Sequence, residues 1–365
     1  MTTTVRPRTP AEIAVIIPYQ LGFHPGPSVI LTVLRGRRLG LLQRHDLRTD
    51  PSDCARVADQ ALEIVTREEA TGLLVIAFED DEGSSAPLCA AMLAAADDHE
   101  VPVQEHVVVR GGRWFGPGCS EACCPDEGLP LPRPEDVPAV AAFVHAGVAP
   151  LASRADLVGG VLPPRDEERA ARLGGHLDVL MRFALARRGI VERTDRLQEE
   201  WQRILDPDPA ATPVAELPDS VLARAAWSLE DRDWRDALMA ALCPGTVPVT
   251  ETHAGDAERA RSAASRCPWV HRTVADGTED TTDEQLRVRS RLVELTRLVP
   301  VEVTPPALTV VAQLAWWSGD GAVAGIALDR ALEIDPDYRL AQLMSQLLAA
   351  GVRLQALTSP GSEAA

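Results

Sequence analysis

The chain contains no lysine and no asparagine, so all 36 of its basic residues are arginine. Without lysine there is neither a phosphate-binding Gly-x-x-x-x-Gly-Lys loop nor a Schiff-base nucleophile, which excludes the enzyme classes that depend on them. Lysine and asparagine share codons that begin with AA, and their joint absence indicates a GC-rich genome. Codon bias therefore explains an arginine-only surface, and guanidinium recognition of carboxylate or phosphate is the alternative.

Long apolar runs are also missing. The nearest candidate, Val137 to Leu151, contains His145 and two prolines, which is typical of a globular segment rather than a membrane span. Residues 1–10 carry arginines but no apolar core and no small-residue cleavage site, so they do not resemble a signal peptide. The sequence thus predicts a cytoplasmic protein that does not enter a membrane.

Acidic residues outnumber basic ones, and the formal net charge is −18 over 365 residues. A chain this acidic is repelled by nucleic acid and by anionic membranes, so neither is expected as a partner. Residues 1–48 are basic instead, because they contain seven arginines and only two acidic residues, Glu12 and Asp46. This basic segment indicates either an anion or partner site, or charge that is satisfied within the fold.

The common catalytic templates are missing as well. There is no nucleophile elbow, no His-Glu-x-x-His metalloprotease motif, and no pair of Cys-x-x-Cys fingers. Whether the protein is an enzyme therefore stays open at this stage.

Strand and helix patterns alternate in the first 150 residues, which predicts a mixed α/β (α+β) domain over 1–150. Strands are predicted at 29–34, 39–47, 73–78, 106–110 and 113–115. Helices are predicted from Pro10 to a kink or end near Pro18, from residue 50 onward, and over 88–96. Residues 117–138 are rich in proline, glycine and cysteine, and are predicted to form an ordered loop.

Strand patterns disappear after about residue 150. Caps such as Ser153, Ser228 and Thr282 begin a series of helical patterns, so residues 151–365 are predicted to be an all-α domain. The boundary is expected between residues 145 and 165, with no strand of four or more residues beyond 165.

The end of the chain gives the sharpest helical pattern. In residues 305–351, Gly319, Ala324, Ala331 and Pro336 match the turn, small and proline positions of a tetratricopeptide repeat. Three helices are predicted there, with turns at Gly319 and before Pro336. One repeat cannot bury its own hydrophobic face, so this tetratricopeptide-like hairpin must dock on the preceding helices.

Three of the seven cysteines lie within six residues, at Cys119, Cys123 and Cys124. An odd number at irregular spacing does not indicate a disulfide framework. The cluster fits a soft metal such as zinc, a redox disulfide between Cys119 and one of the other two, or inert packing. Histidines that could be a fourth zinc ligand are His24, His99 and His106.

A second candidate site combines His24, Arg44 and Asp46. His24 precedes a predicted strand, where a rigid scaffold can position an acid or base. Arg44 and Asp46 are two residues apart on a predicted strand, so their side chains share one face. They can bind a polar ligand together, or they can pair with each other.

The order of several motifs resembles an uncharacterised family, domain of unknown function 4192, found mainly in high-GC Gram-positive bacteria. The motifs are Leu21–Pro25 before Ser28–Leu31, Arg44–Leu47, Arg110–Trp114 before Cys119, Cys123–Pro125, and Leu314–Gly321. The resemblance implies a cytoplasmic bacterial protein and supplies no reaction.

Two functions remain in view. The first is a non-catalytic interaction or regulatory protein, whose helical C-terminal region binds an unidentified protein partner. The second is an enzyme or small-ligand-binding protein with a site formed by His24, Arg44, Asp46 and the Cys119–Cys124 loop. The second function requires the side chains of this site to converge in one pocket, and the first function does not.

Overall fold

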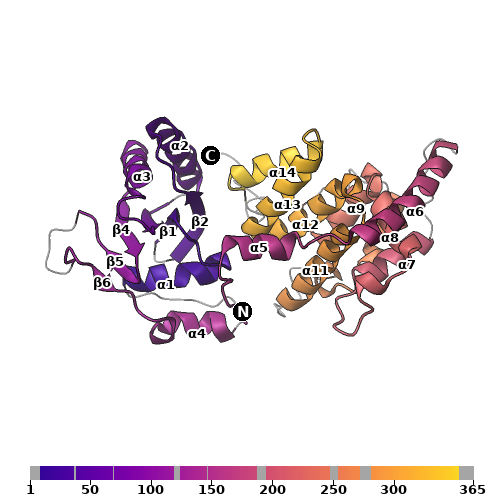
Figure 1. The fold of residues 1–365 in the computed structure, drawn as a ribbon, viewed down its shortest axis with the longest axis horizontal. Helices are drawn as coiled ribbons and strands as arrows, with labels where there is room; N and C mark the ends of the chain where they lie inside the picture. The colour runs from indigo at the N-terminus through magenta and orange to yellow at the C-terminus, as the bar shows by residue number, and fades with distance from the viewer. Residues whose placement is uncertain are drawn as a thin grey trace, which may run out of the picture. The chain divides into compact units, whose positions relative to one another are not determined.

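The computed structural model describes residues 9–36, 38–68, 70–118, 124–145, 147–186, 195–246, 254–271 and 281–352. The chain divides into two compact units, Thr2–Leu157 and Val158–Ala365, called here the N-terminal and C-terminal units. All described strands lie in the N-terminal unit, and the described part of the C-terminal unit contains only helices (Figure 1). The predicted succession of a mixed α/β half and a helical half is confirmed.

A six-stranded sheet organises the N-terminal unit, in the order β2-β1-β3-β4-β5-β6. Its strands are β1 (Ser28–Arg35), β2 (Arg38–Asp46), β3 (Gly72–Phe78), β4 (Val103–Arg110), β5 (Arg113–Phe115) and β6 (Leu129–Pro130). β3 and β4 are parallel and are connected through α3 (Ala86–Asp98), whereas the other neighbours are antiparallel. The strand patterns read from the sequence correspond to β1–β5, and β6 was not predicted.

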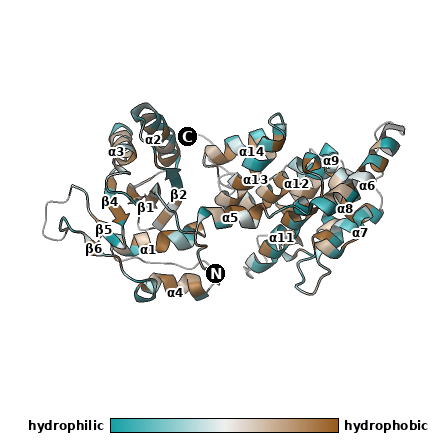
Figure 2. Cartoon of the chain, in the orientation of Figure 1, coloured by the Kyte–Doolittle hydropathy of each residue, from teal (hydrophilic) through white to brown (hydrophobic). Residues whose placement is uncertain are grey.

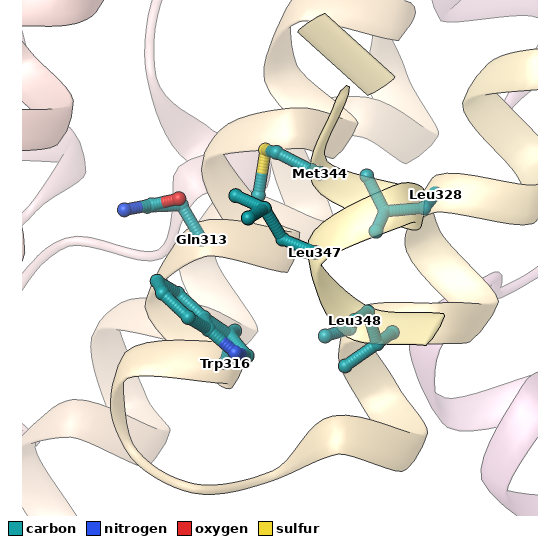
Figure 3. Close-up of a pocket in the computed structure, with 7 residues that line it drawn as sticks. Gln313, Trp316, Leu328, Met344, Leu347 and Leu348 are labelled. Atoms are coloured by element: carbon teal, nitrogen blue, oxygen red, sulfur yellow. The ribbon is translucent and has the colours of Figure 1, made fainter. Parts of the chain in front are cut away.

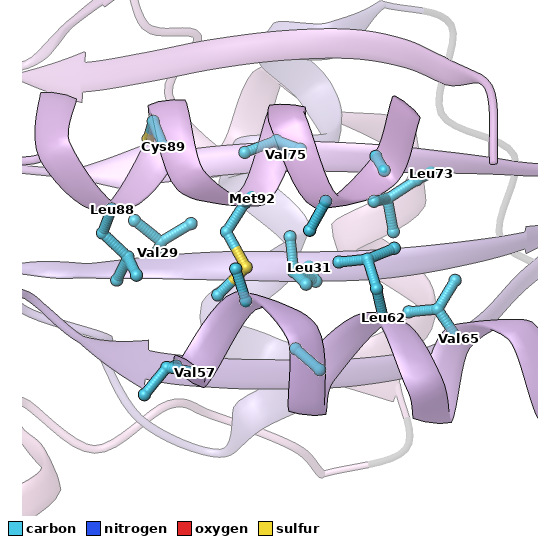
Figure 4. Packing of buried hydrophobic residues seen from close by; sticks show 14 of the residues in the cluster. Val29, Leu31, Val57, Leu62, Val65, Leu73, Val75, Leu88, Cys89 and Met92 are labelled. Carbon is cyan, nitrogen blue, oxygen red and sulfur yellow. The ribbon is translucent and has the colours of Figure 1, made fainter. Parts of the chain in front are cut away.

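Helices α2 (Pro51–Arg67) and α3 cover one face of the sheet (Figure 4). Alternate residues of the strands, such as Val29 and Leu31 of β1, pack against these helices because successive side chains of a strand point to opposite faces. Strand β1 is coloured largely as hydrophobic in Figure 2, whereas α2 includes many hydrophilic residues. This arrangement explains the strong amphipathic pattern of α2.

Helix α1 (Pro10–Leu21) covers the opposite face of the sheet, where it packs against Ile30 and Ile76. A kink or an end was expected near Pro18, and the helix runs past Pro18 to Leu21, where Gly22, with a φ of 79°, ends it. Proline removes one helical hydrogen bond. Here α1 is buried between the sheet and α4 (Pro138–His145), and this packing outweighs the lost bond.

Residues 117–138 are more structured than the ordered loop predicted for them. They include β6 and a 3-10 turn at Pro134–Asp136, and residues 119–123 lie outside the described part of the chain. The chain returns to the sheet through Gly128, which has a φ of +70°. A Cβ at this residue would lie 2.6 Å from the Phe115 ring. Only glycine fits this close approach in a left-handed conformation.

The C-terminal unit is built from helices. In chain order they are α5 (Arg154–Val161, which begins before the division), α6 (Glu167–Ala186), α7 (Asp195–Ile204), α8 (Asp219–Ser228), α9 (Arg232–Leu242), α10 (Ala254–Ala263), α11 (Thr282–Leu298), α12 (Pro305–Trp317), α13 (Gly321–Ile334) and α14 (Arg339–Ala349). Helix α12 is the core, since all its residues from Pro305 to Ala315 are buried. Within the described residues, every helix is too short or too polar to cross a membrane.

Arginines in the C-terminal unit satisfy backbone carbonyl groups. Arg291 of α11 donates hydrogen bonds to the carbonyl oxygens of Ile204 (2.9 Å), Arg203 (2.6 Å) and Thr212 (2.9 Å). The last carbonyls of a helix have no partner within the helix. The planar guanidinium of Arg291 therefore completes the end of α7, a role that the single ammonium of lysine cannot fill with the same geometry.

Candidate functional site

A cavity of about 510 Å³ opens beside β4 in the N-terminal unit. It exists because β5 pairs only with Val108–Arg110, so the first half of β4 has no described strand on that side. Its walls are Pro10, Val103, Gln104, Glu105, His106, Val107, Trp114, Gly116, Pro117, Gly118 and Cys124. This volume lies within the range of about 300–1,000 Å³ that is typical of ligand sites.

His106 is the most unusual group in this cavity wall. Its Nε2 atom is buried and has no hydrogen-bond partner within the described residues. Burial also lowers the pKa of the imidazole below its usual value of 6.5, so the ring is neutral near pH 7. A buried polar atom without a partner costs roughly 1–3 kcal/mol.

Glu105 and Gln104 add polar groups to the cavity. Burial raises the pKa of the Glu105 carboxyl above its usual value. Gln104 lies where the pairing of β3 with β4 shifts register, and its side chain passes over Gly72. A Cβ at residue 72 would lie 2.8 Å from the Gln104 Cγ, so the glycine gives the Gln104 side chain its room.

The cysteine cluster adjoins this cavity. Cys124 lines it, as does Gly118, whereas Cys119 and Cys123 lie outside the described residues. Of the three histidines considered as zinc ligands, His106 is the one that shares the cavity with Cys124. Among the described residues no group of three or more His, Cys, Asp or Glu is placed to hold a metal ion. A metal or a disulfide in the loop therefore stays a prediction.

Arg44 and Asp46 form an ion pair at a different place, near the backbone of the segment that carries His24. Arg44 Nη1 donates to Asp46 Oδ1 at 2.6 Å, and Arg44 Nε donates to the carbonyl oxygen of Pro25, next to His24, at 3.0 Å. The exposed His24 is held through its backbone N–H, which donates to the Leu151 carbonyl at 2.9 Å. The Asp46 side chain is 70% exposed, so this ion pair contributes at most about 1 kcal/mol.

These three residues do not share a pocket with the cysteine loop. None of them lines the cavity beside β4. Strands β1 and β3 lie between β2 and β4 in the sheet, which separates β2 from β4 by about 14 Å at the usual strand spacing. The single site that would combine His24, Arg44 and Asp46 with Cys124 is therefore not formed.

Helix α14 carries exposed apolar side chains on the surface of the C-terminal unit. Leu343 and Leu347 are 40% and 44% exposed, and they lie four residues apart on one side of the helix. Leu347 also borders a dimple of about 20 Å³, whose lining includes Trp316 and Leu348 (Figure 3). This volume admits the tip of one apolar side chain. We call Leu343, Leu347, Trp316 and Leu348 the α14 face.

Sequence reasoning missed Glu105, Trp114 and the α14 face. The α14 face left no readable signal, because the apolar residues of α14 at positions 340, 343, 344, 347 and 348 follow the spacing of one ordinary buried stripe, and the exposure of Leu343 and Leu347 is seen only in the structure. Glu105 and Trp114 left none. Both belong to the cavity because β5 is short, which depends on where the chain turns after Phe115.

Comparisons with known proteins identify one family. The family model described as "Domain of unknown function (DUF4192)" matches residues 10–354. Searches of curated proteins and of solved structures found no significant match.

Proposed function

The chain belongs to the DUF4192 family, a domain of unknown function, and we propose that this member is a non-catalytic protein that binds an amphipathic helix of a partner protein on the α14 face. The observation that carries the proposal is the exposure of Leu343 and Leu347 on one side of α14, together with the dimple that Leu347 borders. Isolated exposed leucines are ordinary, but two on one side of a helix, next to a hollow that accepts an apolar side chain, are typical of a binding surface.

The spacing of the leucines favours a helix as the occupant. Leu340, Leu343 and Leu347 follow an i, i+3, i+7 pattern, which is the seam that one helix offers to another. Helices α12, α13 and α14 also stack in sequence, and α14 is the last helix that the structure describes. In stacked helical arrays the exposed side of the last helix is where a further helix packs.

A tetratricopeptide-like packing of α12 and α13 supports this proposal. Gly319 has a φ of +87° in the turn between the two helices, and Ala324 and Ala331 are fully buried in α13. Small residues at these positions allow the two helices to approach closely. Hairpins of this class present helical surfaces to partner proteins, which is the function proposed here.

Charge favours a basic partner helix over a second copy of the chain. The net charge of −18 makes two copies repel each other. The turn between α13 and α14 carries Asp335 and Asp337, whereas the exposed Glu333 in the last turn of α13 is paired with Arg330 at 2.9 Å. Arginine or lysine residues flanking the apolar stripe of the partner helix would complement the carboxylates of Asp335 and Asp337.

The proposal is tested with the double variant Leu343→Glu/Leu347→Glu. The matched control is Gln346→Glu/Ala349→Glu, which adds the same charge at exposed positions on another side of α14. Each protein is used as bait in native cell extract, and co-purifying proteins are quantified by mass spectrometry. We expect a partner that is retained by the parent and the control and is lost by at least tenfold from the leucine variant. Equal retention by all three proteins, or no partner of the parent, would contradict the proposal.

The cavity beside β4 favours a second candidate function, the binding of a small ligand or ion by the N-terminal unit. It is supported by the volume of about 510 Å³ and by the unsatisfied His106 Nε2. The predicted zinc or disulfide at Cys119, Cys123 and Cys124 belongs to this function.

A further inference from the structure

We propose that residues 353–359, which follow the last described residue, fold back over the α14 face and cover it until a partner helix displaces them. Two features of the described residues carry this inference. The described part of the chain ends at the edge of the dimple, and the dimple wall contains the buried Gln313, whose side chain has no hydrogen-bond partner among the described residues. Only the displacement by a partner rests on the proposed function, because the covering itself occurs within one chain.

Helix α14 ends in a turn that stops the chain from continuing along the helix axis. Gly351 has a φ of +67°, and its N–H donates to the Leu348 carbonyl at 3.0 Å. The Val352 N–H donates to the Leu347 carbonyl at 3.1 Å. These two hydrogen bonds form a Schellman motif, in which a left-handed residue ends the helix. The segment after Val352 therefore begins beside two residues of the α14 face.

A contact with α12 fixes the last described residue at the dimple. The Trp316 indole N–H donates to the Val352 carbonyl at 2.9 Å, and Trp316 lines the dimple (Figure 3). Two residues of chain span at most about 7 Å, which is enough for Leu354 to reach the dimple from Val352. Leu357 is close enough in the sequence to reach Leu343, which lies one helical turn from Leu347 along α14.

Gln313 indicates that a peptide backbone fits over the dimple. It lies three residues before Trp316 on α12, it is 6% exposed and it lines the dimple (Figure 3). Its side-chain amide forms no hydrogen bond with the residues that the structure describes. Buried polar groups are nearly always hydrogen-bonded, so this amide calls for a partner. An amide side chain both donates and accepts, which matches the N–H and C=O groups of a peptide segment.

The covalent tether favours this segment over a separate molecule. A segment joined to its binding surface by a few residues acts at an effective concentration of roughly millimolar, so a weak contact keeps it bound. Its one charged residue is Arg353, whereas the proposed partner helix places several basic residues near Asp335 and Asp337. The partner helix therefore gains contacts that the segment lacks, and it can displace the segment.

The test uses the purified full chain alone at low concentration, with a photoreactive phenylalanine analogue in place of Leu347. Mass spectrometry identifies the peptides that irradiation joins. The first variant is Leu354→Glu/Leu357→Glu, and its matched control is Gln355→Glu/Ser359→Glu, which adds the same charge and keeps both leucines. The second variant is Gln313→Met, which removes the amide and nearly keeps the shape. Circular dichroism confirms that each protein is folded.

We expect residue 347 to crosslink to residues 353–359 of the same chain in the parent and in the control. The yield should be about tenfold lower in Leu354→Glu/Leu357→Glu, because the segment loses its apolar contacts, and lower also in Gln313→Met. No crosslink to this segment, or equal yields in the parent and the leucine variant, would overturn the proposal. A crosslink between two copies of the chain would assign the α14 face to a second copy and would also overturn it.

Displacement by a partner is tested separately, with Leu354→Glu/Leu357→Glu as bait in native cell extract. If the segment covers the face about nine-tenths of the time, this variant should bind the partner about tenfold more tightly than the parent does. Unchanged partner binding would overturn the regulatory part of the proposal. An intrachain crosslink without any partner in extract would contradict the proposed function and leave the covering segment supported.

Discussion

Acid should destabilise the N-terminal unit through His45, a residue of β2 opposite Val29 on the face covered by α2 and α3. Its Nε2 lies 3.2 Å from Gln43 Oε1, and the Gln43 amide donates to the Ala61 carbonyl of α2 at 3.3 Å. The pKa of His45 is lowered from 6.5 to about 4, mainly by burial and also by the positive charges of Arg48 and Arg44, which outweigh the opposing charge of Asp46.

The direction of the pH effect on stability follows from proton linkage. Because the pKa of His45 is lower in the folded state, the unfolded chain binds the proton more readily between pH 6.5 and 4, and stability falls as the pH falls through this range. At ~1.36 kcal/mol per pH unit, the full effect is roughly 3 kcal/mol below pH 4. Between pH 7.5 and pH 4.5 it amounts to about 2.5 kcal/mol.

Hydrogen exchange of β1 and β2 amides at several pH values measures this local free energy of opening. Carboxyl groups titrate in the same range, so the informative quantity is the difference between the parent and His45→Gln, which keeps a neutral polar side chain. We expect the parent to lose about 2.5 kcal/mol more than this variant between pH 7.5 and 4.5. His24→Gln, at an exposed histidine, should behave like the parent. Parallel pH profiles of the parent and His45→Gln would refute the reasoning.

Three further substitutions test the packing. Ala331→Leu should cost roughly 1–3 kcal/mol in thermal or denaturant unfolding, because Ala331 of α13 is fully buried and a larger side chain overpacks the site, and an unchanged melting temperature would contradict that packing. Arg291→Lys should cost about 1–2 kcal/mol by leaving carbonyls at the end of α7 unsatisfied, whereas Arg232→Lys, with a side chain 83% exposed, should be neutral in the same measurement. Gly128→Ala should destabilise the N-terminal unit by roughly 1–2 kcal/mol from its backbone conformation alone. Contact with the Phe115 ring adds to this, and wild-type stability in urea would count against the close approach.

Much of the fold could be predicted from the sequence because its elements have regular periods. The stripe of Cys54, Val57 and Ala58 in α2 repeats at helical spacing, and these residues are buried against the sheet. The end of α1 at Leu21 could not be read exactly, since the sequence shows the hydrogen bond lost at Pro18 but not the packing on both sides of the helix. Element type was thus readable wherever one face is buried, whereas the exact end of an element depends on tertiary contacts.

The candidate site was less predictable, because it depends on which strands become neighbours. Arg44 and Asp46 could be placed together, since they are two residues apart on one strand. Strands β1 and β3 separate Arg44 and Asp46 from Cys124. This separation follows from the order of the strands in the sheet, which no local sequence pattern predicts. His106 was one of three candidate histidines, and only the strand order and the short β5 bring it into one cavity with Cys124.

The proposed function is tested most directly by crosslinking from the α14 face in living cells. A photoreactive phenylalanine analogue replaces Leu343 in one strain and Ala349, on another side of the same helix, in a second. The account predicts that irradiation joins residue 343, and not residue 349, to a single partner through a peptide with basic residues and an apolar stripe at helical spacing. Equal crosslinking from both positions, or a crosslinked peptide without that helical pattern, would contradict it.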